Sequence, residues 1–317
     1  MKKIISLLLA LCMLLPVAAL AEEAAPVKTG LSFVTTIAQG RNGGTQANIA
    51  LAAVNVDDNG VITACVFDYI QAAIGFDATG KLTTDLSTTF QSKVEKGDAY
   101  GMRSASSIKA EWNEQAAAFA AFCVNKTLDE VKAAELNEKN QVVDVVASCT
   151  LAVSEFLPSL EDAVNNAVHM GAKKGDALKL VQVSSMSKSK DATETADGQA
   201  QVYTHVGAFN LNGNVITAAY IDAVQATAKF NAKGEITSDL TAPVQSKNVI
   251  KEGYGMKGIS PIGKEWYEQT AAFCAFITGS TLDDAISTAI NPAATDVISS
   301  CTIGTTDFLG LLVKLSQ

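Results

Sequence analysis

The residues of this chain that could best take part in chemistry lie in two copies of one polar turn. The first copy runs from Asp144 to Thr150 and the second from Asp296 to Thr302. Further hydroxyls lie inside the turns, on Ser148, Ser299 and Ser300. A turn that leads into a helix offers free N–H groups and the positive end of the helix dipole, which suit a phosphate group. The alternative is structural, because a threonine at this place can simply cap the helix that follows.

The two turns belong to an internal sequence repeat. A shift of 154 residues places Trp112 on Trp266 and the segment 61–63 on 215–217. About half of the positions match over roughly 70 residues, which indicates a duplicated domain. Any function is therefore best sought in residues that both copies share.

Several aromatic and basic residues occur at equivalent positions in both copies and could contact a ligand. The aromatic residues, which could stack on a planar ring, are Tyr100, Tyr254, Trp112 and Trp266. Lys93 and Lys247 each end a Gln-Ser-Lys segment and could pair with a phosphate. The structural alternatives are a tryptophan in the core and a solvated lysine. Glu111 and Glu114, which recur as Glu265 and Glu268, are expected on a solvated helix face.

The elements that must position these residues are strands followed by helices in each copy. Segments 49–56 and 61–68 are rich in β-branched residues and flank an Asn-Gly turn, which predicts a hairpin. Apolar residues then recur at helical spacing around each tryptophan, in a helix expected to begin near Ser260-Pro261 in copy two. Strand-like runs at 142–146 and 297–298 precede a last helix from about Glu155 or Asp307. The fold class predicted is α+β, as two tandem copies of a small domain with an antiparallel sheet and helices.

The domain boundaries follow from this pattern. We predict a first repeat over 28–170, a linker over 171–178 that contains Lys173-Lys174-Gly175-Asp176, and a second repeat over 179–317. Each repeat is long enough to bury an independent core.

The N-terminus resembles a secretory signal peptide. Lys2 and Lys3 precede an apolar run over 4–15, and a small-residue site ends at Ala21, so residues 1–21 are expected to be removed. Cys12 lies inside the apolar run and makes no convincing lipoprotein site. We therefore expect a secreted or extracytoplasmic protein. No later segment reaches the ~18 continuous apolar residues of a membrane span.

Composition excludes some functions. The chain has 33 acidic and 24 basic residues, which argues against nucleic acid as a partner because phosphate backbones need clustered Lys and Arg. The two histidines, His169 and His205, occupy non-equivalent positions, and no spacing matches a metal site. We therefore predict no catalytic residues.

The polar turns resemble the motif of the FMN-binding domain family, which includes the flavin-carrying C subunit of sodium-pumping NADH:quinone reductase. That motif runs Asp, two residues, Ser or Thr, Gly, Ala, then Ser or Thr, and the last hydroxyl is esterified to the phosphate of FMN in covalent members. The resemblance implies FMN on Thr150 or Thr302, with Asp144 and Asp296 as the matching acids. It also implies redox partners and a role as an extracytoplasmic flavin electron carrier rather than a stand-alone enzyme.

The turns also depart from that motif. Ser148 and Ser300 replace glycine, cysteines replace alanine, and Ala147 replaces the first hydroxyl of copy one. These departures favour an alternative function, a cofactor-free surface or ligand-binding module that kept the scaffold and lost the flavin.

Five cysteines follow the signal peptide. Each copy has one in the main helix and one in the turn, so we predict disulfides between Cys123 and Cys149 and between Cys274 and Cys301, with Cys65 free. The alternative is that all are small buried apolar residues.

Overall fold

The computed structural model describes residues 24–40 and 43–317. The predicted signal peptide, 1–21, lies outside the described residues. Within the described part, no helix is both long enough and apolar enough to cross a membrane.

The first repeat opens with a three-stranded antiparallel meander. Its strands are β1 (Pro26–Gln39), β2 (Thr45–Val56) and β3 (Ile62–Ile74). A fourth strand, β4 (Val168–Lys173), pairs with β1, so the sheet order is β3-β2-β1-β4. The predicted hairpin is confirmed, and residues 57–60 form its turn.

The second repeat forms a separate three-stranded sheet. Its strands are β5 (Ala177–Ser185), β6 (Gly198–Asn212) and β7 (Val215–Phe230), in the order β5-β6-β7. The segment predicted as a linker consists of the end of β4, a tight turn and the start of β5, so the chain passes between the repeats without a free stretch.

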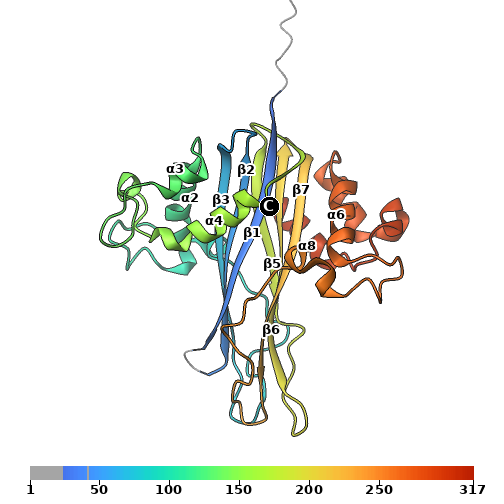
Figure 1. Cartoon of the computed structure of the whole chain (residues 1–317). Helices are drawn as coiled ribbons and strands as arrows, with labels where there is room; N and C mark the ends of the chain where they lie inside the picture. Colours follow the sequence, from blue (N-terminus) through green and yellow to red (C-terminus); the bar gives the residue numbers. More distant parts are fainter. Residues whose placement is uncertain (1–23, 41–42) are drawn as a thin grey trace, which may run out of the picture.

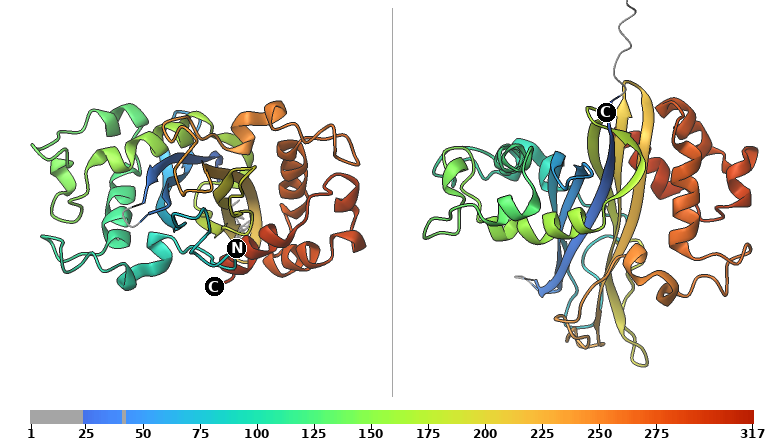
Figure 2. Two further views of the ribbon diagram at one scale, coloured as in Figure 1. Left: turned by 90° about the horizontal axis from the view of Figure 1, so that it is seen from below. Right: turned by 45° about the horizontal axis from the view of Figure 1, so that its top comes forward.

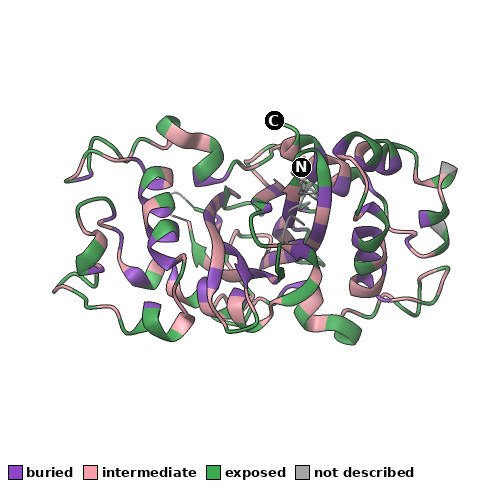
Figure 3. Cartoon of the chain, turned by 90° about the horizontal axis from the view of Figure 1, so that it is seen from above, coloured by how far each residue is buried: buried purple, intermediate pink, exposed green. Residues whose placement is uncertain are grey.

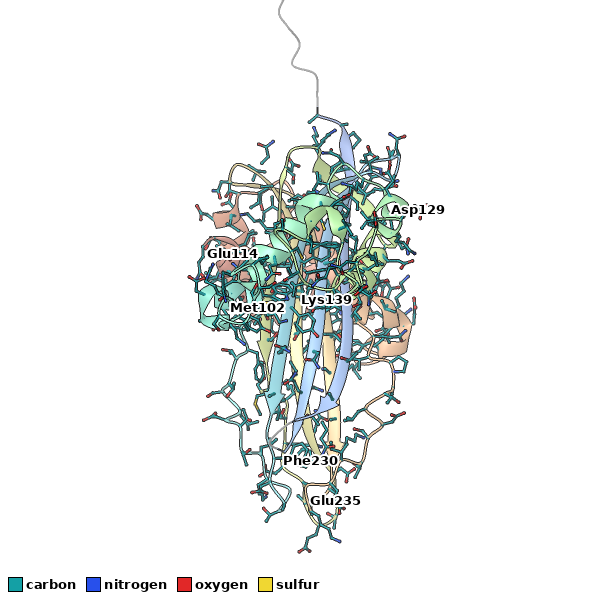
Figure 4. All side chains as sticks on the ribbon, turned by 90° about the vertical axis from the view of Figure 1, so that its left-hand side faces the viewer. Met102, Glu114, Asp129, Lys139, Phe230 and Glu235 are labelled. Atoms are coloured by element: carbon teal, nitrogen blue, oxygen red, sulfur yellow. The ribbon has the colours of Figure 1, made fainter. Side chains whose placement is uncertain are left out.

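The two sheets pack face to face and share a central core (Figure 2). Phe76 and Phe230 occupy equivalent positions in the two repeats, and their rings stack 3.9 Å apart. Each repeat therefore has an outer core of its own but also depends on its twin to cover the inner face of its sheet. Figure 4 shows Phe230 and Glu235 at the narrow end of this sandwich, away from Met102 and Glu114 in a helical layer.

Helices cover the outer face of each sheet, giving four layers (Figure 1). On the first sheet lie α1 (Lys93–Lys96), α2 (Trp112–Cys123), α3 (Leu128–Lys132) and α4 (Leu157–Asn165). On the second lie α5 (Lys247–Ile250), α6 (Trp266–Ile277), α7 (Leu282–Ile290) and α8 (Thr306–Leu315). Buried residues gather on the strands and on the helix sides that face them (Figure 3). The predicted α+β class is confirmed.

Two local predictions are wrong. The main helices begin at Trp112 and Trp266, after Glu111 and Glu265, because each glutamate forms a capping box with a second glutamate three residues on. The runs at 142–146 and 297–298 are short 3₁₀ turns (Val143–Val145 and Asp296–Ser299) instead of strands. Their backbone N–H groups bond locally, as from Val145 to Val142, and strand propensity yields to that context.

Candidate functional site

The motif turns are fastened to the main helices by one buried glutamine in each repeat. The Oε1 atom of Gln115 accepts hydrogen bonds from the backbone N–H (2.9 Å) and the hydroxyl (3.0 Å) of Thr150. Gln269 holds Thr302 in the same way, at 2.8 and 3.1 Å. Both glutamine side chains are fully buried. The threonine hydroxyls are thus committed to internal contacts.

The other polar residues of the turns also face the chain itself or solvent. The hydroxyl of Ser148 donates to the carbonyl of Val145, and those of Ser299 and Ser300 donate to backbone carbonyls three residues before them. Asp144 and Asp296 are exposed.

The long helices do not start at the motif threonines. Helices α4 and α8 begin at Leu157 and Thr306, several residues later. The structural alternative, a threonine cap, is therefore wrong, and the phosphate site expected from a helix N-terminus has no helix end beside the threonine.

The predicted lysine and aromatic residues do come together. In the first repeat the Lys93 ammonium lies over three rings, at 4.3 Å from the centroid of Tyr69, 5.0 Å from Tyr100 and 4.9 Å from Trp112. Lys93 is only 7% exposed and Trp112 only 2%. Cation–π attraction of this kind strengthens when the cation is removed from water.

The second repeat contains a matching lysine over three aromatic rings, and we call each of these two arrangements a cage. The Lys247 ammonium lies 4.6 Å from the ring centroid of Tyr203, 4.4 Å from Tyr254 and 4.8 Å from Trp266. It also donates a hydrogen bond to the Tyr203 hydroxyl. Burial lowers the pKa of Lys247 to about 8, against the pull of Asp222 and Asp307. Burial also lowers the pKa of Lys93.

A buried carboxyl group supports each lysine from the third strand. Asp68 accepts from the N–H of Val94, next to Lys93, and Asp222 accepts from the N–H of Asn248, next to Lys247. Burial raises the pKa of each aspartate to about 6, although hydrogen bonds from Ser92 and Ser246 oppose the shift. These groups fix the start of the short helix that carries the lysine.

Glu111 positions the tyrosine of the cage. Its carboxylate, on a residue 2% exposed, accepts from the N–H groups of Met102 (2.9 Å) and Arg103 (2.8 Å), and Glu265 repeats this in copy two. Gly101 has a φ of 79°, which lets the chain turn directly after Tyr100. The prediction of a solvated glutamate face is wrong for Glu111 and Glu265, because these carboxylates cap helices and bind a loop, whereas Glu114 is exposed as expected.

The two cages differ on the second strand. Asn48 and Ala50 of β2 pair with Gln71 and Tyr69 of β3, whereas Tyr203 and His205 of β6 pair with the equivalent residues Gln225 and Ala223. Tyr203 and His205 thus stand where the first repeat has Asn48 and Ala50. His205 is buried between Tyr203, Trp266 and Phe308.

The first cage opens onto a cavity of about 420 Å³, which we call the Lys93 pocket. The lining residues that matter here are Thr36, Asn48, Tyr69, Gln71, Lys93 and Glu155. Lys93 has no hydrogen-bond acceptor among the described residues, unlike Lys247. Glu155 acts on Lys93 through space, but the two form no direct ion pair in the described part of the chain.

The five cysteines in the described part of the chain are free thiols in the structure, so neither predicted disulfide is present there. The thiol of Cys65, predicted to stand apart, interacts with that of Cys123, because β3 and α2 pack side by side. Burial raises the pKa of Cys274 to about 12, and the neighbouring thiol of Cys301 raises it further.

Sequence reasoning therefore found Lys93, Tyr100 and Trp112 but missed their strand neighbours. The residues missed as site members are Tyr69, Tyr203, His205, Asn48, Glu155 and Asp307. Spacing did not reveal the strand residues, because the second hairpin turn is one residue shorter and shifts β6 by one residue against β2 when the repeats are aligned.

Among residues 24–40 and 43–317, no group of three or more His, Cys, Asp or Glu side chains could hold a metal ion. Comparison of the chain with family models, curated proteins and solved structures finds no match.

Proposed function

We propose that this chain is an exported ligand-binding module that holds a small molecule in the Lys93 pocket of its first repeat. One observation carries the proposal. Lys93, a residue only 7% exposed and with no hydrogen-bond acceptor among the described residues, lines a cavity of about 420 Å³. A charged group that is largely removed from water and has no acceptor costs free energy, and a ligand with an oxygen acceptor would lower that cost. The cavity volume is within the usual range for small-molecule sites.

The second repeat supports this proposal as an internal comparison. There the same lysine is satisfied by the hydroxyl of Tyr203. The protein's own side chain thus supplies the acceptor that the first repeat leaves to a ligand.

The flavin-carrier function stays the competing proposal, and the residues fit FMN poorly. The hydroxyl of Thr150, which would form the ester, already donates to a buried glutamine. The ring of Trp112, expected to stack on the flavin, is 2% exposed and faces Lys93. These contacts favour the cofactor-free alternative.

The binding function can be tested by giving the first cage the two strand residues of the second cage. Asn48→Tyr with Ala50→His should fill the Lys93 pocket and abolish binding of small molecules detected by ligand-observed NMR with a panel of acids, amines and amino acids. Tyr203→Asn with His205→Ala is the matched control, since it leaves the first pocket intact. Equal binding by the filled variant and the wild type would contradict the proposal.

The flavin alternative has its own test. The full chain is coexpressed with a flavin transferase in a host that exports it, and intact mass and visible absorbance are recorded. Unmodified mass and colourless protein agree with our proposal. Yellow protein heavier by FMN, with the added mass lost in Thr302→Ala, would replace it by the carrier.

A further inference from the structure

We infer that the ligand of the Lys93 pocket is a small zwitterion of the amino-acid type, whose carboxylate meets Lys93 and whose N–H group meets Glu155. This inference rests on the proposed function and adds the chemical class of the ligand.

The second repeat shows which partners the two charged positions accept. Lys247 donates to the oxygen of Tyr203, and Asp307 lies 3.5 Å from Nδ1 of His205. Burial lowers the pKa of His205 to about 3, so its ring is neutral at neutral pH and can present an N–H to the carboxylate. One oxygen acceptor and one nitrogen donor, side by side, therefore occupy this cage.

The first repeat keeps both charged groups and lacks both partners. Lys93 matches Lys247, and Glu155 matches Asp307, one residue before the equivalent Phe156 and Phe308. Ala50 has no polar side-chain atom, and the Oδ1 atom of Asn48 accepts from Gln46 instead. Two opposite charges that line one cavity without touching each other call for a molecule that bridges them.

Charge complementarity narrows the class further. A simple acid would satisfy Lys93 but place its negative charge near Glu155, and a simple amine would satisfy Glu155 but lie near the Lys93 ammonium. Charge-assisted hydrogen bonds are about twice as strong as neutral ones, so a ligand with both charges gains at both ends. The ring of Tyr69 lines the same cavity and offers apolar surface to the side chain of such a ligand.

Isothermal titration calorimetry with three probes tests the inference. The probes are L-phenylalanine, N-acetyl-L-phenylalanine, which lacks the positive charge, and L-phenylalaninamide, which lacks the carboxylate. We expect L-phenylalanine to bind and each analogue to bind at least about tenfold more weakly, the loss of one charged contact. Lys93→Met and Glu155→Gln should each weaken L-phenylalanine binding, whereas Lys247→Met, the matched change in the second cage, should not.

The outcomes separate this inference from the function on which it rests. If N-acetyl-L-phenylalanine binds as tightly as L-phenylalanine, or if Glu155→Gln binds as the wild type does, the zwitterion is wrong while ligand binding stands. If neither these probes nor the NMR panel binds, both fail. Glu155 is half-buried in a short turn, so its variant keeps the test valid should Lys93→Met fail to fold.

Discussion

Asn55 and Asn210, equivalent residues of the two repeats, hydrogen-bond to each other at 2.6 Å inside the sandwich. Thr29 closes the contact, donating to Asn55 (3.1 Å) and accepting from Asn210 (2.9 Å). All three residues are buried. The two copies therefore meet through a polar contact between like residues as well as through the stacked pair Phe76 and Phe230.

Breaking this contact should destabilise the whole sandwich. We expect Asn55→Ala to lower the free energy of unfolding by about 1–3 kcal/mol, because it leaves the buried amide of Asn210 short of a partner. The double variant with Asn210→Ala should lose less than the sum of the single losses. Guanidinium unfolding measures all three, with exposed Asn59→Ala as the control. Strictly additive losses would show that the two amides are not coupled.

The motif threonines should matter for stability in protein that carries no flavin. Thr302→Val removes the hydroxyl that donates to Gln269 and should cost about 1 kcal/mol of unfolding free energy. Gln269→Leu should cost more, about 2–4 kcal/mol, since it leaves the Thr302 N–H and neighbouring loop groups without their partner. Thermal or chemical unfolding of flavin-free protein checks this. A Thr302→Val variant as stable as the wild type would contradict the structural role of the hydroxyl.

Oxidation should join Cys65 to Cys123. A small disulfide such as oxidised glutathione would accept the two electrons, releasing two glutathione thiols as the Cys65–Cys123 bond forms by exchange. Peptide mapping by mass spectrometry without reductant should find this bond. Cys65→Ala, which copies Ala219 of the second repeat, is the control and should leave Cys123 reduced. A Cys123–Cys149 bond in the wild type would contradict the contact between the thiols of Cys65 and Cys123.

The buried aspartates should make the protein more stable in mild acid. Burial raises the folded-state pKa of Asp68 and Asp222 to about 6, above the ordinary value of 3.8. The folded state therefore binds more protons between these values, so each carboxyl adds stability as the pH falls from about 6 to about 4. The expected gain is of order 1–3 kcal/mol at each site.

Asn substitution isolates this effect. Asp68→Asn with Asp222→Asn keeps an oxygen acceptor but does not titrate, so its unfolding free energy should depend less on pH over that window than that of the wild type. His205 acts in the opposite direction, because burial lowers its pKa to about 3, but it is present in both proteins. Identical pH profiles for the two proteins would contradict the assignment.

The duplication and the residues of the cages could be read from the sequence. Hairpin turns, helical spacing around Trp112 and Trp266, and the repeated Gln-Ser-Lys segment depend on local geometry, which each stretch of chain carries by itself. The repeated sequence indicates Lys93, Tyr100 and Trp112 as candidates, and the structure brings them together.

Only the tertiary structure decided what each face touches. A nearly continuous apolar run such as 49–56 is typical of a strand buried on both faces, but a face buried by a helix and a face buried by the other repeat have the same pattern. For the same reason Tyr203 and His205 could not be placed opposite Lys247 by spacing, because strand register across a hairpin that is one residue shorter determines their position. The partner of Cys123 likewise depends on packing between β3 and α2, since contacts between distant segments leave no periodic signal in the chain.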